Sequence, residues 1–179
     1  MKKLFSVLCL VALFSSFAHA QQKRDPLTEP EVDQLRETAQ EPDKRLKLMV
    51  KFARARMLAI DQLRSDPKLA QGRGEKIHDL LEDFMNLVDE IDDNVDNYSG
   101  KQSDIRKSLK DVVEADTEFQ LKLRTLKDAA KNDPKAADEA KDYDFVLDNT
   151  LEAVNQSVDN ARKTLDEQNE EFAKKNKKK

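Results

Sequence analysis

Cysteine, glycine, proline and tryptophan are all scarce in this chain: its 179 residues include one, three, five and none of them, respectively. A sheet protein needs many turns and runs of β-branched or aromatic residues, and no segment of useful length alternates apolar with polar residues. Charged residues instead make up 38% of the chain, which fits exposed helix faces. These features predict an all-α protein.

Residues 1–20 have the pattern of an export signal. Lys2 and Lys3 precede an apolar run, and Ala18-His19-Ala20 matches the small-x-small pattern of a signal-peptidase site. The run is about 15 residues long, shorter than the roughly 20 that cross a bilayer as a helix. We therefore expect a signal cleaved after Ala20, a flexible leader over residues 21–27, and a secreted or periplasmic protein.

Cleavage of this signal changes which chemistry is available. Cys9 and His19 would leave, so the mature chain would have no cysteine and a single histidine, His78. Disulfides, thiolate catalysis, Cys-ligated zinc and Cys-attached haem are then excluded for the mature form. A lipid anchor is not expected either, because Cys9 lies within the apolar run, directly after bulky Leu8.

The charge balance argues against nucleic acid as a partner. Loss of Lys2 and Lys3 moves the net charge from −4 to −6. Binding to phosphates needs clustered Lys and Arg, and the body of this chain is acidic.

Five segments repeat apolar residues at helical spacing. Breaks at Pro42, Pro67, Gly100 and Pro134 separate them. Thr28-Glu29-Pro30-Glu31 has the form of a capping box, which favours a helix start. The predicted helices cover residues 28–40, 43–65, 75–98, 103–131 and 134–173.

Each predicted helix has one apolar side that must be buried, and the connections are short. We therefore expect an antiparallel up-down four-helix bundle with a short extra N-terminal helix and a long C-terminal helix. Residues 28–173 form its single domain. The last helix is longer than its partners, so we expect the short first helix to cover the overhang.

Opposite charges on two of these helices predict that they are neighbours. Residues 44–56 hold six basic residues and no acid, whereas residues 75–98 hold nine acids and one lysine. We expect the two to pair across the bundle, which selects partner and orientation more than it stabilises. The alternative is that the basic helix docks on an anionic membrane or partner.

Motifs for metals and cofactors are incomplete. Glu75-x-x-His78 has the spacing found in di-iron bundles, but the mature chain lacks the second histidine that such a site needs. The segment from Asp92 to Asp96 resembles the start of an EF-hand loop, yet Asn97 stands at its sixth position and Ser103 at its twelfth. Methionines on apolar rows are typical core residues, so no cofactor is expected.

Nothing in the sequence pairs a nucleophile with a base. There is no Gly-x-Ser-x-Gly motif and no glycine-rich phosphate loop, and carboxylates on solvated helix faces have no environment that separates their pKa values. We therefore expect that the protein is not an enzyme.

Asp116 interrupts the apolar row of the fourth predicted helix and is a candidate buried polar residue. A buried carboxylate needs a partner, and Arg56 or Thr150 is expected to supply it. Asp116 then either sets the register of the bundle or contacts a ligand in its interior.

Apolar and basic residues outside the predicted rows are candidates for contacts with partners. Leu121 and Phe145 lie off the rows of their helices and mark either scattered surface residues or an interface with another protein or a second copy. The lysines of a basic tail over residues 174–179 form either a solvated end or a contact with an anionic surface. They are Lys174, Lys175, Lys177, Lys178 and Lys179.

In general style the chain is similar to small exported helical proteins of bacteria, some of them periplasmic chaperones. The Leu-Thr-x-x-Gln repeat of such chaperones is absent from the chain. The leading hypothesis is a non-catalytic interaction protein, a scaffold or chaperone-like module that binds a protein or itself. The alternative is a helical bundle that binds a small ligand or a divalent cation.

Overall fold

The computed structural model describes residues 25–176 of the chain. These residues form six α-helices, one 3₁₀-helix over Pro67–Leu69, and no strand, which confirms the predicted all-α class. The expected signal over residues 1–20 lies outside the described residues. The helices are α1 (Glu29–Glu37), α2 (Pro42–Ser65), α3 (Arg73–Gly100), α4 (Arg106–Asn132), α5 (Pro134–Ala140) and α6 (Asp144–Asn176).

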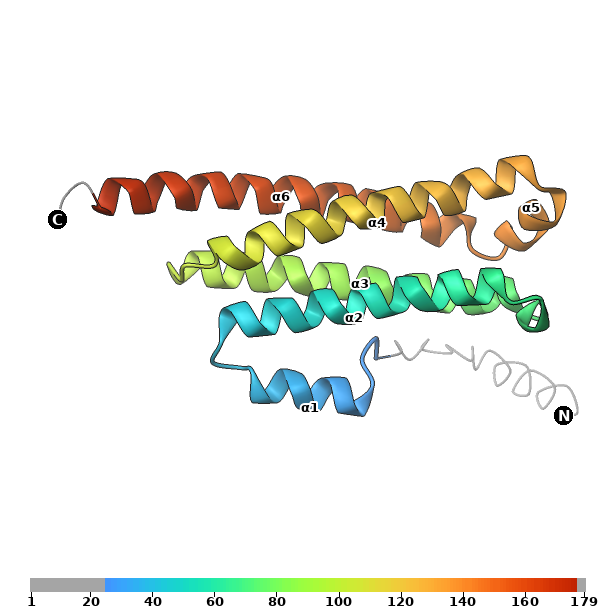
Figure 1. Ribbon diagram of the computed structural model, residues 1–179, viewed down its shortest axis with the longest axis horizontal. Coiled ribbons are helices and arrows are strands. Elements are labelled where there is room, and N and C mark those ends of the chain that lie inside the picture. The colour runs from blue at the N-terminus through green and yellow to red at the C-terminus, as the bar shows by residue number, and fades with distance from the viewer. Residues whose placement is uncertain (1–24, 177–179) are drawn as a thin grey trace, which may run out of the picture.

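The long helices α2, α3, α4 and α6 form the bundle, and successive ones run in opposite directions (Figure 1). Around the bundle, α2 packs on α3, α3 on α6, α6 on α4, and α4 on α2. The neighbours α2/α3 and α4/α6 are therefore antiparallel, whereas α2/α4 and α3/α6 are parallel. Consecutive helices α3 and α4 thus lie diagonally opposite each other.

The apolar rows of the four long helices meet in one core. Phe84 of α3 and Phe119 of α4 pack edge to face across the diagonal, with ring centroids 4.9 Å apart and ring planes at 84°. Both side chains are fully buried. Such a pair adds about 0.5–1.5 kcal/mol beyond the burial of its area.

The Thr-x-x-Glu sequence at α1 and the Asp-Pro sequence at α5 cap the first turns of these helices, as expected from their side-chain oxygens. The Thr28 backbone N–H and hydroxyl both donate to the Glu31 carboxylate, at 2.8 and 3.0 Å, in the capping box of α1. Asp133 accepts a hydrogen bond from the Lys135 N–H at 2.9 Å and caps α5.

The expected single helix over residues 134–173 is wrong, because residues 141–143 form a turn between α5 and α6. This turn packs against the start of α3. Gly74 lies so close to it that a Cβ there would be 2.8 Å from the Glu139 carbonyl oxygen. The His78 Nδ1 lies 3.0 Å from the Asp142 carbonyl oxygen. The apolar row runs through this break without interruption, so the turn depends on tertiary contacts.

Helix α1 does not cover the overhang of α6, which corrects the expected placement. It packs along α2 and lies on the side of α2 away from α6 (Figure 1). Arg45 of α2 links α1 to the bundle. Its guanidinium donates to the Leu35 carbonyl oxygen of α1 at 2.9 Å and to the Asn94 side chain of α3 at 3.2 Å. The C-terminal end of α6 projects beyond the other helices.

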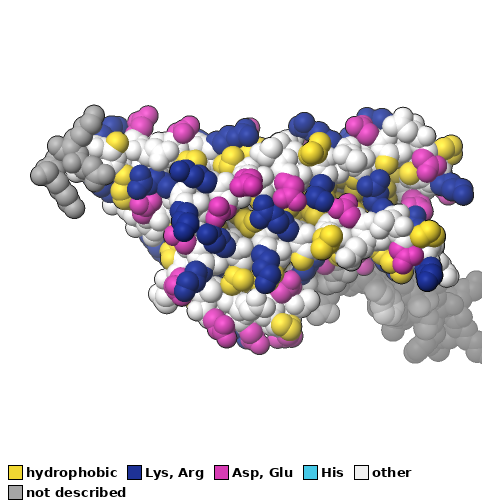
Figure 2. Space-filling view, in the orientation of Figure 1, with side chains coloured by type: hydrophobic (Ala, Val, Ile, Leu, Met, Phe, Trp, Pro, Cys, Tyr) yellow, Lys and Arg dark blue, Asp and Glu magenta, His cyan; other side chains and the backbone are white. Residues whose placement is uncertain are grey.

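The predicted adjacency of the basic helix and the acidic helix is confirmed, because α2 packs on α3. The charge pairing expected between the two helices stays a prediction, and two basic residues of α2 pair with α4. Lys47 pairs with Asp111 at 3.3 Å and Arg54 pairs with Glu118 at 3.0 Å, and both acids lie on α4. Charged side chains of both signs are interspersed over the face in Figure 2. The apolar residues of α2 and α3 pack together in the core.

Candidate functional site

Asp116 lies in the interior of the bundle, on α4, with 1% of its surface exposed. The Ser157 hydroxyl of α6 is 3.0 Å from Asp116 Oδ2 and 2.8 Å from Asp92 Oδ1 of α3. One residue from each of three helices thus contributes to a single polar cluster, which we call the carboxyl cluster (Asp92, Asp116 and Ser157).

The geometry of the carboxyl cluster favours an additional proton. A serine hydroxyl has one hydrogen and can donate to one carboxylate. For Ser157 to bond both acids, the second carboxyl group must itself be protonated and donate to the Ser157 Oγ. A protonated carboxyl also avoids two neighbouring negative charges at a site where Asp116 is buried and Asp92 is partly buried.

Electrostatics favour the same protonation. Burial raises the pKa of Asp116 to about 7, against the opposing hydrogen bond from Ser157; the charge of Asp92 raises it further and that of Arg162 lowers it. Burial likewise raises the pKa of Asp92 to about 6, and the Ser157 hydrogen bond opposes this shift. The charges of Asp96, Asp89 and Asp93 on the same helix add to the rise. The two acids interact, so these values describe a coupled pair.

The expected partners of Asp116 are wrong. Arg56 contacts α1: its guanidinium holds the Glu31 carboxylate in two hydrogen bonds, at 2.8 and 2.6 Å. The Thr150 hydroxyl donates to the Val146 carbonyl oxygen of its own helix at 2.6 Å. The residue that Asp116 contacts is instead Ser157, which was not among the expected partners.

Arg56 and Glu31 form a second polar pair, which is partly buried, with 12% and 13% of their side chains exposed. Arg56 also donates to the Pro26 carbonyl oxygen at 2.7 Å. Burial of the Glu31 carboxyl favours a higher pKa, but hydrogen bonds from Arg56 and Thr28 outweigh it and hold the pKa below its usual value. The Arg56–Glu31 pair thus links the start of α1 to the middle of α2.

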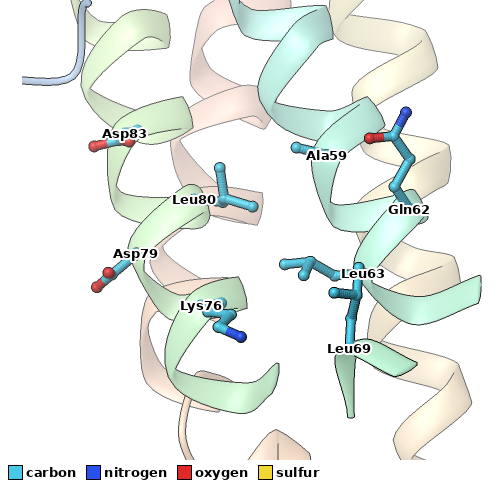
Figure 3. A pocket seen from close by; sticks show the side chains of 8 residues that line it. All are labelled: Ala59, Gln62, Leu63, Leu69, Lys76, Asp79, Leu80 and Asp83. Atoms are coloured by element: carbon cyan, nitrogen blue, oxygen red, sulfur yellow. The ribbon is translucent and has the colours of Figure 1, made fainter. Parts of the chain in front are cut away.

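An apolar groove of about 400 Å³ opens between α2 and α3. Leu63 and Leu80 point toward each other across it (Figure 3), whereas Asp79 points away on the far side of α3. Ala59 and Leu69 complete its apolar lining. We call this the α2/α3 groove.

The two candidate interface residues lie on the surface, with Leu121 68% and Phe145 81% exposed. The Gln120 side chain of α4 donates a hydrogen bond to Asn155 of α6, so Leu121 lies beside the part of α6 around Asn155. Phe145 lies ten residues from Asn155 on α6, or about 15 Å along the helix axis. Leu121 and Phe145 are therefore two separate exposed apolar residues, on α4 and α6, rather than one contiguous patch. Leu58 on α2, 55% exposed, is a third such position.

The basic C-terminal end is helical farther than expected, because α6 continues to Asn176. Lys174 and Lys175 lie one turn after Glu170 and Glu171 and pair with them at 3.4 and 2.6 Å. Lys177, Lys178 and Lys179 lie outside the described residues.

Residues of the incomplete metal motifs have separate partners. His78 lies against the α5–α6 turn, and Asp96 accepts a hydrogen bond from Asn160 at 3.3 Å. Between residues 25 and 176, no three His, Cys, Asp or Glu side chains are grouped so that they could hold a metal ion. Over the same residues, no helix is both long and apolar enough to cross a membrane.

The sequence contained partial signals for the two missed members of the carboxyl cluster. Ser157 is three residues after Val154 and four before Ala161, on the buried side of α6, where Thr150 and Thr164 are buried as well. Asp92 lies beside the core residue Ile91. The parallel neighbour relation of α3 and α6 brings them together, and no short-range pattern indicates it.

The chain matches no protein-family model, and comparison with curated proteins and with solved structures finds no match.

Proposed function

We propose that this chain is an exported, non-catalytic interaction protein, a scaffold or chaperone-like module, that binds an apolar helical segment of a partner protein. The α2/α3 groove is the observation that carries the proposal. Leu63, Leu69 and Leu80 present apolar surface there on rigid helices.

The way α1 packs indicates what the α2/α3 groove accepts. Helix α1 runs antiparallel to α2, because Glu31 meets Arg56 whereas Leu35 meets Arg45. Beyond the start of α1, the next turns of α2 present Ala59 and Leu63 to the groove. The groove therefore continues a surface on which a short amphipathic helix already packs, and a partner helix with apolar residues three and four apart fits the same surface.

Export is part of the proposal and rests on the residues that precede the described region. The pattern of Lys2, Lys3 and Ala18-His19-Ala20 supports it. We expect the N-terminal sequence of exported material to begin at Gln21. Exported material that begins at Met1 would contradict cleavage of this signal.

Photo-crosslinking from defined positions tests binding in the groove. A benzophenone side chain replaces Leu69, which is 37% exposed in the groove, or Leu58, which is 55% exposed outside it. In cells that export the protein, we expect a discrete adduct from position 69 and none of the same mass from position 58. Leu63→Gln in the same chain should abolish that adduct, because it places an amide in the apolar wall. The same adduct from both positions, or an adduct that Leu63→Gln leaves unchanged, would exclude the groove as the binding site.

A further inference from the structure

A second cavity, of about 430 Å³, lies at the end of the bundle where α2 ends and α3 begins. Helix α5, which contributes Lys135, Ala136 and Glu139 to its lining, is labelled in Figure 1. Five of its ten lining residues are charged, whereas three of the eight residues that line the α2/α3 groove are charged. We call it the terminal pocket, and its polar lining residues are Arg64, Arg73, Asp133, Lys135, Glu139 and Tyr143.

Positive charge exceeds negative charge in the terminal pocket. Arg73 pairs with Glu139 at 3.1 Å, and Asp133 caps α5 through the Lys135 backbone N–H. Within the described part of the chain, neither the Arg64 guanidinium nor the Lys135 ammonium makes a hydrogen bond or an ion pair. These two cations therefore have no carboxylate partner of their own.

Two further groups in the terminal pocket favour an acceptor. The Arg73 Nε is buried and has no hydrogen-bond partner among residues 25–176. A buried donor without an acceptor is costly and calls for a water or an ion. The Tyr143 side chain is 3% exposed, and burial raises its pKa while the positive charge of Arg64 opposes the rise. Arg64 and Tyr143 both line the terminal pocket.

We propose that the terminal pocket binds a small oxyanion, a phosphate or a carboxylate group. The planar guanidinium of Arg64 matches the two oxygens of such a group, and Lys135 adds a point charge. Arg73, whose Nε lacks an acceptor, and Tyr143 line the same pocket and are further potential donors. This site is separate from the α2/α3 groove and does not depend on the proposed protein partner.

Tyrosine fluorescence can report binding, because the chain has two tyrosines and no tryptophan. In a Tyr98→Phe background, the signal of Tyr143 is recorded while inorganic phosphate or acetate replaces chloride at constant ionic strength. We expect a saturable change with at least one of the two anions, which also identifies the preferred class. Arg64→Gln should weaken that binding at least about tenfold, because it removes charge-assisted hydrogen bonds.

Lys51→Gln is the matched control, since Lys51 is an exposed basic residue of the same helix and lies outside the terminal pocket. It removes one positive charge, as Arg64→Gln does, and should leave the dissociation constant unchanged. A response that does not saturate, or one that Arg64→Gln and Lys51→Gln alter equally, would show an adventitious ion only and would overturn the proposal.

Discussion

Asp116→Asn is expected to make the protein more stable at pH 8 than the unchanged chain, by about 2–4 kcal/mol. Asparagine keeps an oxygen and adds a donor at the position of the buried carboxyl, yet it carries no charge at any pH. Chemical denaturation at a series of pH values measures the difference. The gain should disappear near pH 4, where the carboxyl of Asp116 is protonated in the folded protein.

The direction of this change in stability with pH follows from the proton that Asp116 holds in the folded protein. The folded-state pKa of Asp116 is raised from 3.8 to about 7, so between these values the folded protein holds a proton that the unfolded chain has released. The resulting stability is fully present below about pH 4 and is lost as the pH rises toward 7. Asp92, with a pKa of about 6, contributes in the same direction.

Other charged groups face the carboxyl cluster and remain in the variant. Asp89, Asp93 and Asp96 act from α3, and Arg162 acts from α6. Asp159→Asn is the control, because Asp159 is an exposed residue of α6. If Asp116→Asn and Asp159→Asn showed the same dependence of stability on pH, the carboxyl cluster would not hold the proposed proton.

Arg56→Met should release α1 from the bundle. Loss of one partner of a fully buried ion pair costs about 3–5 kcal/mol, and we expect a smaller cost for this partly buried pair, because the Glu31 charge stays behind without its guanidinium. Helix α1 has nine residues and one fully buried side chain, Leu35, so little else holds it. Hydrogen exchange of residues 29–37 should become fast while exchange in α3 and α4 stays slow.

The matched control is Arg54→Met, which removes a surface ion pair from the same helix. Arg54 and Glu118 are 41% and 42% exposed, so their pair contributes at most about 1 kcal/mol. Exchange of residues 29–37 should be unchanged in this variant. Slow exchange of α1 in Arg56→Met would mean that apolar contacts of Leu35 suffice to hold the helix.

Local sequence chemistry predicted most of the fold. The four long helices follow from their apolar rows, and Thr28 and Asp133 lie at breaks where a helix start was expected. Two features were not accessible in this way. The turn after Ala140 depends on the close approach of Gly74, which is remote in sequence. The diagonal placement of α3 and α4 depends on how two hairpins stack, and each helix pattern is compatible with more than one order around the bundle.

The candidate site was predicted only in part for the same reason, because contacts between helices that are remote in sequence leave no local pattern. Asp116 stands out because it interrupts an apolar row, a property of its own helix. Its contacts with Ser157 and Asp92 depend on the register between three helices. Arg56 was expected to be its partner, but the carboxylate that Arg56 contacts is Glu31 of α1.

The shared proton of the carboxyl cluster can be measured directly by carbon-13 NMR of aspartate side-chain carboxyls as a function of pH. The structure predicts two carboxyls that titrate as a coupled pair with midpoints near 6 and 7, and both should be lost from the spectrum in the Asp92→Asn, Asp116→Asn double variant. If every aspartate of the folded protein instead titrated near pH 4, both acids would be charged in the interior at neutral pH and the account would be contradicted.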